Sequence, residues 1–331
     1  MSIEVSANLP REAFSNDASR AGAVEIGHVA DAVEWDQLIA AAAFPHLPQS
    51  FAYGEGKRAK GWRIVRASFS IANRIVAIVQ VLERRVLGIR ILTRINRGPL
   101  FMEADPADEV VRAVYSAIRR RWGRYYGGAL LIAPALATGE ASHARLRSLG
   151  YKLRHDHAWI SGRIDLCRSE EEMWAGLDSR FRNRYRGAER SGATLRIADD
   201  AETLDWMIAR HLENMHDKQF KGIDAIFIRA QATAAQGRVL VFQLLHEGQP
   251  VAGMMVVRFG DSCEYHIGWF GEAGRKVNAG NFLMWQIMRE MKRRGCAEFD
   301  VGGMAEGSGY TAFKRTMRSK EFRLAGEWMS F

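Results

Sequence analysis

Cysteines, long apolar runs and secretory signals are scarce or absent in this sequence. Its 331 residues include three cysteines, Cys167, Cys263 and Cys296, which are far apart and form no CxxC pair. Dispersed cysteines exclude a disulfide framework and suit a reducing compartment, where we expect them to pack as small apolar side chains. No apolar run reaches the roughly 18–20 residues of a membrane-spanning helix. The N-terminal segment lacks the apolar stretch of a secretory signal, so we expect a soluble, cytoplasmic protein.

Several catalytic and metal-binding motifs are also missing. The sequence contains no GxxxxGK[ST] phosphate loop, no GxSxG nucleophile elbow and no HExxH zinc motif. His155 and His157 share one face of an expected strand, but no third ligand has a suitable spacing, so we expect no bound metal. Acidic residues number 38 against 47 Lys and Arg, which gives a formal net charge of +9. This excess favours anionic partners: phosphates, nucleic acid or an anionic membrane face.

The chain is long enough for two domains, and its hydrophobic fraction of 47% is typical of globular proteins. Residues 1–22 are polar and predict a loose tail. Residues 23–160 and 161–331 share the order strand–strand–strand–helix–strand–helix–strand, which indicates a duplicated α/β domain. A helical insertion is expected at about 169–235, and apolar periodicity predicts a helix from about Asn278 to Arg294.

Four segments carry a resemblance to a known family. They are PQSFAYGEGKRAKGW, RFRNRYRGAERSGATLRI, EFDVGG and GYTAFKRTM, in this order over about residues 45–325. The set resembles the Fem-type (FemABX) aminoacyl-tRNA-dependent peptidyltransferases and the related BioF2-like acetyltransferases of the GNAT superfamily. The resemblance implies an α/β (α+β) fold of two tandem GNAT-like acyltransferase domains, each a mixed, mainly antiparallel sheet flanked by helices.

The catalytic candidates follow from this resemblance. In the family, a lysine at the position of Lys314, after Phe313, is proposed to stabilise charge where the aminoacyl ester is cleaved. A desolvated ammonium aimed at the developing oxyanion stabilises the transition state more than the ground state. Asp300 has the chemistry to orient or deprotonate the incoming amine, and Gly302 and Gly303 would let a substrate approach the backbone. A solvated lysine and an ordinary strand-end turn are the alternatives.

Two further groups of basic residues are candidates for binding. Lys57 and Arg229 match positions at which the family grips the phosphates of a UDP-linked precursor, and a Lys charge with an Arg fork suits a pyrophosphate. Arg182, Arg186 and Arg190 stack at i,i+4 on one helix face. Because such like charges disfavour an isolated helix, the face suggests a tRNA phosphate backbone that neutralises it. Ordinary solvated surface cations are the alternative for both groups.

The sequence thus predicts an aminoacyltransferase that moves an amino acid from aminoacyl-tRNA to an amine, with no cofactor. The acceptor would be anionic, such as a UDP- or lipid-linked muropeptide of peptidoglycan synthesis, and a peripheral contact with the inner face of the membrane stays open. An acyl-CoA-dependent N-acyltransferase of the BioF2-like type is the first alternative. The segment Arg275–Asn281 disfavours it, because Asn278 stands where a GNAT pyrophosphate loop has glycine. A non-catalytic RNA- or envelope-binding module is the second alternative.

Overall fold

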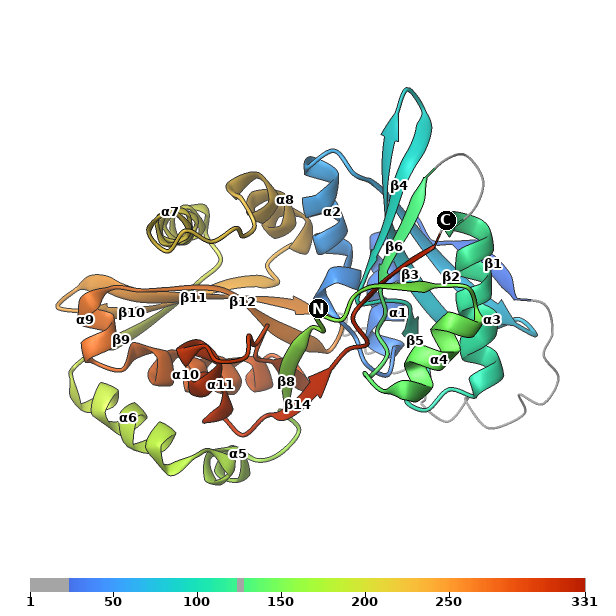
Figure 1. The fold of residues 1–331 in the computed structure, drawn as a ribbon. Coiled ribbons are helices and arrows are strands. Elements are labelled where there is room, and N and C mark those ends of the chain that lie inside the picture. The colour runs from blue at the N-terminus through green and yellow to red at the C-terminus, as the bar shows by residue number, and fades with distance from the viewer. Residues whose placement is uncertain (1–23, 124–127, 331) are drawn as a thin grey trace, which may run out of the picture.

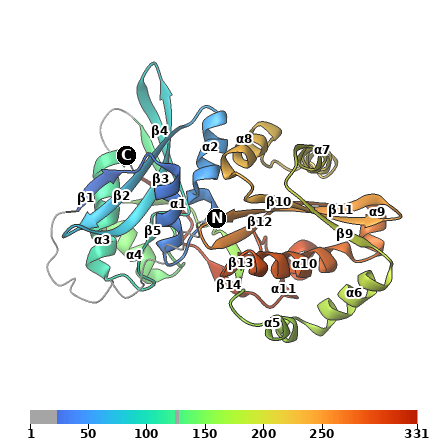
Figure 2. The ribbon, with the colours of Figure 1, turned by 180° about the vertical axis from the view of Figure 1, so that it is seen from behind.

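A computed structural model describes residues 24–123 and 128–330, which form two mixed β-sheets lying side by side (Figures 1 and 2). The predicted tail at residues 1–22 lies outside the described residues. Helices flank each sheet, which confirms the predicted α/β (α+β) class with two mixed sheets. None of the helices in the described ranges has the length and apolarity needed to cross a bilayer.

The first sheet has eight strands within the described residues, in the order β1-β2-β3-β4-β6-β15-β7, with β5 paired to β3. Neighbouring strands are antiparallel except β4 and β6, which are parallel. The strands are β1 (Glu25–His28), β2 (Arg63–Ile71), β3 (Arg74–Val86), β4 (Ile89–Asn96), β5 (Leu100–Phe101), β6 (Ala129–Ala133), β7 (Lys152–His155) and β15 (Glu327–Ser330). Helices α3 (Asp108–Ile118) and α4 (Glu140–Ser148) pack on this sheet through a core that contains Val114, Leu146 and Trp328.

The second sheet has the order β14-β8-β13-β12-β11-β10-β9, and β12 and β13 form its parallel pair. Its strands are β8 (Ile160–Asp165), β9 (Thr194–Ala198), β10 (Val239–His246), β11 (Gln249–Phe259), β12 (Ser262–Phe270), β13 (Glu298–Asp300) and β14 (Lys320–Arg323). The helices of this half are α5 (Glu170–Gly176), α6 (Ser179–Arg190), α7 (Ala201–Asp217), α8 (Ala225–Ala235), α9 (Glu272–Lys276), α10 (Ala279–Arg293) and α11 (Gly309–Arg315). The helix expected at Asn278–Arg294 is thus confirmed as α10.

Helices cover both faces of the second sheet (Figure 1). On one face lie α6 and α10, and α6 turns Phe181, Tyr185 and Ala188 toward the core because these residues recur every three to four positions. On the other face lie α7 and α8. Helix α1 (Ala32–Ala41), from the first half, joins that same core through Trp35 and Ile39, and α2 (Phe51–Ala59) packs along α8. This shared core holds the two halves together.

The segment 161–331, expected to form one domain, divides its strands between the two sheets. Strand β15 lies between β6 and β7 of the first sheet, where Trp328 pairs with Ile132 and Leu153. The burial of Trp328 explains why β15 joins the first sheet. Its side chain is completely enclosed in the core of that sheet, and its indole N–H donates to the Ala325 carbonyl at 2.8 Å. The segment expected as a helical insertion at 169–235 contains α5 to α8, and also the edge strand β9.

Candidate active site

The parallel strands of the second sheet part from each other near its centre. Strands β12 and β13 pair over three positions that end at Glu264 and Asp300. Strand β13 stops there, whereas β12 continues to Phe270. Gly302 then turns the chain away with φ of +74°, and a Cβ at this position would lie 2.6 Å from the Tyr265 carbonyl oxygen. Glycine is therefore required to open the gap between the strands.

Lys314 fills the bottom of this gap. It comes from α11 and is completely buried, and its Nζ donates a hydrogen bond of 2.8 Å to the Gly303 carbonyl. Two aromatic rings enclose the amine, since Nζ lies 5.1 Å from the ring centre of Tyr265 and 4.3 Å from that of Tyr310. Burial lowers the pKa of Lys314 to about 7. Near neutral pH this lysine is therefore poised between its charged and neutral forms.

Two buried carboxylates oppose that shift by favouring the charged form of Lys314. They belong to Asp300 and Glu264. The Asp300 carboxylate accepts the Gly302 N–H at 2.8 Å and a hydrogen bond from the Ser161 hydroxyl. Asp300 therefore holds the Gly302 turn in place, in addition to placing negative charge near the lysine.

A cavity of about 400 Å³ lies above Lys314. Residues of α7, β12 and α11, and of the segments that follow α7 and β13, form its wall: His211, Asn214, Lys218, Phe220, Tyr265, His266, Ile267, Gly268, Phe270, Gly303, Tyr310 and Lys314. Burial lowers the pKa of His266 to about 3, so its ring is neutral at physiological pH. The Nε2 atom of His266 is buried and finds no hydrogen-bond partner in the described part of the chain. With two lysines and no acidic side chain among the lining residues, the cavity suits an anionic substrate that can also hydrogen-bond to an imidazole.

The first half of the chain contributes a charged residue beside this site. Arg97, just after β4, forms a buried two-pronged ion pair with Glu264 at 2.9 and 3.2 Å. Its guanidinium also lies 4.2 Å from the ring centre of Trp159. Sequence reasoning missed both Arg97 and Glu264, because neither belongs to a motif and the contact joins residues far apart in the chain.

Phe313 and the two predicted phosphate-binding residues lie in different surroundings. Phe313 stacks on Phe181 at 6.3 Å and packs against the core between α11 and α6, so it supports α11 and does not line the cavity. Lys57 lies 5.0 Å from the ring centre of Phe227, and the Phe227 ring lies 6.3 Å from the ring of His266 in the cavity wall. Arg229 is 54% exposed and pairs with Asp205 at 2.9 Å. The structure therefore brings Lys57 toward the cavity but not Arg229.

The three arginines predicted to form one tRNA-binding face have unequal environments. The Arg182 guanidinium donates to the last carbonyls of α5, including that of Ala175 at 3.0 Å, and so caps that helix. Arg186 and Arg190 are exposed, and the Arg186 guanidinium lies 5.8 Å from the ring centre of Trp174. Two exposed cations of the predicted face thus remain for a phosphate backbone.

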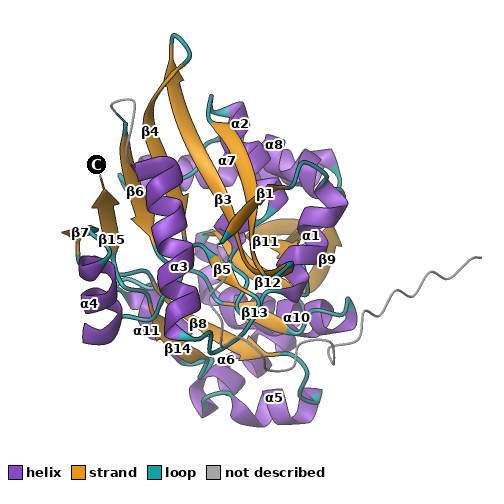
Figure 3. Cartoon of the chain, turned by 90° about the vertical axis from the view of Figure 1, so that its right-hand side faces the viewer, coloured by secondary structure: helices purple, strands orange, loops and turns teal. Residues whose placement is uncertain are grey.

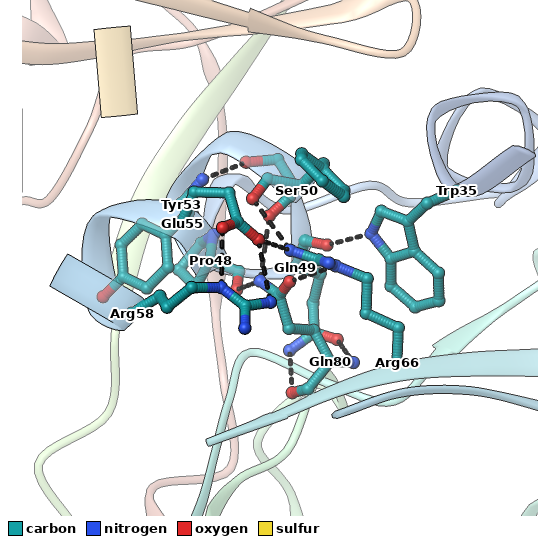
Figure 4. A network of polar contacts seen from close by, with 10 residues as sticks. Trp35, Pro48, Gln49, Ser50, Tyr53, Glu55, Arg58, Arg66 and Gln80 are labelled. Carbon is teal, nitrogen blue, oxygen red and sulfur yellow. Dashed lines mark hydrogen bonds and ion pairs between the residues drawn. The ribbon is translucent and has the colours of Figure 1, made fainter. Parts of the chain in front are cut away.

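The segment containing Gln49 has a structural role in the first half (Figure 4). The Gln49 side chain lies between β3 and β4, where it accepts the Gln80 N–H at 2.6 Å and donates to the Asn96 carbonyl at 2.8 Å. Gln80 in turn donates to the Ser50 carbonyl at 2.8 Å and accepts from the Arg66 guanidinium at 2.8 Å. This buried network fills the space between β3 and β4. The Gln-Ser residues that this segment shares with the Fem-type family therefore stabilise the fold and do not line the cavity.

The N-terminus of α10 is a second place where an anion can bind. Asn278 precedes the helix in the left-handed conformation with φ of +57° and makes no side-chain cap, and no acidic residue lies in the first turn. The side-chain amide nitrogen (Nδ2) of Asn281 is buried and has no partner among the residues described. Free N–H groups at a helix start attract phosphates. Within the same ranges, no group of three or more His, Cys, Asp or Glu residues is arranged to hold a metal.

A comparison with protein families identifies the class of this domain. Residues 179–315 match the model of the acetyltransferase (GNAT) domain. The matched segment contains the parted strands, the cavity wall and Lys314, so the second half of the chain is an acyltransferase domain of the GNAT superfamily, as predicted. No curated protein matches the sequence.

Solved structures share the fold over nearly the whole chain. FemX superposes with a TM-score of 0.77 at 16% identity, covering 92% of this chain and 96% of FemX. A tandem GNAT protein from the clavulanic acid biosynthesis pathway gives 0.54 at 12%, covering 93% and 98% of the two chains. L-PGS from Bacillus licheniformis gives 0.54 at 14%, covering 92% and 93%. The chain therefore has the tandem GNAT fold of these proteins, and the predicted resemblance to Fem-type members of the superfamily is confirmed.

Proposed function

We propose that this protein transfers an aminoacyl group from aminoacyl-tRNA to an amine of an anionic acceptor, such as a UDP- or lipid-linked peptidoglycan precursor. One observation carries the proposal: a buried lysine, Lys314, lies in the gap between β12 and β13 beneath a cavity without acidic lining residues. The Phe-Lys motif supports the choice of donor, because the Fem-type family places a lysine there at the aminoacyl ester.

The reaction needs charge stabilisation and one proton transfer. The acceptor amine attacks the ester carbonyl carbon, a C–N bond forms, and the carbonyl electron pair moves onto oxygen. The C–O bond to the ribose 3′-oxygen then breaks, while the former amine loses a proton and the 3′-oxygen gains one. Protonated Lys314 stabilises the oxyanion, and its pKa of about 7 suits delivery of that proton to the leaving oxygen.

A donor screen tests the proposal. The purified protein is incubated with amine acceptors and either aminoacyl-tRNA or acyl-CoA, each labelled in the acyl group, and products are identified by mass spectrometry. Transfer from tRNA that is lost in Lys314→Met supports the proposal. Transfer from acyl-CoA alone assigns the N-acyltransferase function, and tRNA binding without turnover by the wild-type protein contradicts an enzymatic role.

Acyl-CoA is the second candidate donor because of the start of α10. Its acid-free first turn and the unpartnered Asn281 amide offer hydrogen-bond donors to a pyrophosphate. Replacing Asn281 with Leu removes the polar partner at similar size. We expect this variant to raise the donor KM if the donor is acyl-CoA, and to leave it unchanged if the pyrophosphate never binds there.

The exposed arginines of α6 supply a second test of tRNA binding. Replacing Arg186 and Arg190 with Gln removes two charges and keeps good helix formers. If both contact phosphates, the slope of log affinity against log salt should flatten by roughly 1.4–1.8. Arg182 is left intact because it caps α5. Arg120→Gln with Arg121→Gln, on the first half, is the matched control, and an unchanged slope in the α6 variant would show a merely solvated face.

A further inference from the structure

A hairpin of the first sheet carries an unusual concentration of exposed apolar residues. Strands β3 and β4 extend beyond the rest of the first half (Figures 1 and 3). At its tip Val86 pairs with Ile89 across a turn of Leu87 and Gly88. The exposed fractions are 54% for Val86, 97% for Leu87 and 58% for Ile89, and Ile91 is also exposed. This stretch holds four of the eleven exposed large apolar side chains within the described residues, so they form a cluster.

Neither the turn nor the fold explains the leucine at the tip. Leu87 has φ of +49° and Gly88 has φ of +79°, the pattern of a two-residue turn that prefers Asn or Gly at its first position. A leucine in the left-handed region is disfavoured by its Cβ. Since its side chain is almost fully exposed, no packing within the chain offsets this strain. An apolar side chain held in this way points to a contact outside the protein.

Basic residues lie directly behind the apolar tip. The stretch 84–94 contains four arginines and no acidic residue: Arg84, Arg85, Arg90 and Arg94. Arg85 and Arg90 pair with the buried Glu83, and Arg94 pairs with Glu327 at 2.6 Å. Arg84 has no acidic partner among the described residues. The Arg84 guanidinium lies 4.6 Å from the ring centre of Trp62 at the base of the hairpin. We call the arginines behind the tip the cationic collar. The apolar tip, the cationic collar and the Trp62 indole follow each other in the order in which a bilayer presents acyl chains, headgroup phosphates and interfacial water.

We propose that the β3–β4 hairpin docks the protein on an anionic lipid bilayer. The exposed apolar side chains of residues 86, 87, 89 and 91 would insert among the acyl chains, with Arg84 and Arg85 at the headgroup phosphates. Nucleic acid fits less well, because it offers nothing to the apolar tip. A second copy of the chain would bring the same cationic collar against the first, and like charges repel. From the tip, β4 runs eight residues to Arg97 beside the site, a span of roughly 26 Å at about 3.3 Å per residue.

The first test follows the tip itself. Leu87→Cys, made together with Cys167→Ser because Cys167 is the exposed cysteine, is labelled with an environment-sensitive fluorophore. We expect a several-fold rise in fluorescence with phosphatidylglycerol-containing vesicles, and quenching by lipids brominated in the acyl chain. Ile226→Cys, which replaces a residue of 57% exposure on α8, should not respond. An equal response of the two labels, or none at Leu87→Cys, overturns the proposal.

The second test uses unlabelled protein and separates folding from docking. In Leu87→Asn with Ile89→Thr, asparagine suits the turn and threonine suits a strand, so the melting temperature should hold or rise. Co-sedimentation with anionic vesicles should weaken about tenfold or more, because apolar area drives insertion. Val33→Thr with Ile226→Thr, which changes apolar residues of 65% and 57% exposure elsewhere, should bind as wild type.

Three results would overturn the proposal: equal binding by the tip variant and wild type, equal binding to neutral phosphatidylcholine vesicles, or a tip signal that requires RNA or higher protein concentration instead of lipid. None of these measurements depends on acyl transfer, so the docking surface and the proposed enzymatic function fail or stand separately.

Discussion

The two halves of the molecule differ most at the parallel pair of strands in each sheet. In the first half β4 and β6 stay paired over five positions, to Asn96 and Ala133. In the second half β12 and β13 separate after three positions, and Lys314 lies in the gap. The main helix of each half differs as well. Helix α3, after β5, begins with Asp108 and Glu109, whereas the first turn of α10, after α9, has no acid. Acidic residues at a helix start repel a phosphate. The candidate site is therefore open in the second half, whereas strand pairing and acidic residues close the same place in the first half.

The largest effect is expected at Lys314. Lys314→Met should lower the transfer rate by about 100-fold or more, because it removes the group that stabilises the oxyanion, with little change in donor binding. The exposed Lys320→Met is the control. A wild-type rate in a folded Lys314→Met protein would remove the functional distinction between the halves.

Lys314→Met should also change the thermal stability of the protein in a pH-dependent way. The pKa of Lys314 is lowered by burial to about 7, so between pH 7 and the ordinary value near 10.5 the unfolded chain binds more protons. The cost in folding free energy of burying the charged Lys314 is complete below pH 7, and it fades as the pH rises toward 10.5. Lys314→Met should therefore raise the melting temperature at pH 6 and raise it less at pH 9.5, which differential scanning calorimetry would measure.

The buried glutamine of the first half should matter for stability and not for the reaction. Gln49→Ala leaves the Gln80 N–H and the Asn96 carbonyl without this partner and creates a cavity, so we expect a loss of about 2–3 kcal/mol in the free energy of unfolding. Urea denaturation measures this loss, with the exposed Gln249→Ala as control. The rate of the folded variant should stay within about threefold of wild type, and a large fall in kcat would show that the first half takes part in chemistry.

Closing the gap in the second half should cost activity. In Gly302→Ala the new Cβ would lie 2.6 Å from the Tyr265 carbonyl oxygen, so the strands must shift and we expect about a tenfold lower kcat. Gly307→Ala is the matched control, because Gly307 also has positive φ (+76°) but no atom within 4 Å of the new Cβ. Backbone strain alone would lower the activity of both variants equally, and that result would contradict the role of the gap.

The smallest effect is expected at the basic residue that the first half directs toward the cavity. Lys57→Ala should raise the KM for an anionic acceptor several-fold with nearly unchanged kcat, because it removes binding shared by ground state and transition state. Arg229→Ala should change neither constant, since Arg229 pairs with Asp205 at the surface. Steady-state kinetics with varied acceptor concentration compare the two variants. Equal effects on the acceptor KM would show that Lys57 and Arg229 act at one site.

Local patterns in the sequence identified much of the second half. The apolar periodicity of α10 and the Asp-x-Gly-Gly end of β13 depend on neighbouring residues, so they could be predicted closely. The Phe-Lys motif singled out Lys314 as a candidate catalytic residue. Its burial, its changed pKa and the Arg97–Glu264 pair arise from contacts between distant segments, for which no local signal exists.

The arginines of α6 are equally spaced in the sequence but have different contacts in the structure. Arg182, Arg186 and Arg190 recur at i,i+4, but only Arg182 meets the end of α5. Periodicity indicates which face a side chain shares, and it does not indicate what lies opposite that face. For the same reason the pattern assigned the last strand of the chain to the second half, whereas β15 pairs with β6 and β7 in the first sheet.

The position of β15 has a consequence for the order in which the molecule folds. Residues 328–330 pair with residues 130–132 of β6, and residues 327–329 pair with β7. The strand that joins β6 to β7 is therefore absent until the whole second half has been synthesised. During translation β6 and β7 therefore each expose an unpaired strand edge, and such edges are prone to pair with other chains. The half that is made first on the ribosome is completed last, and the long sequence separation of this contact slows its closure.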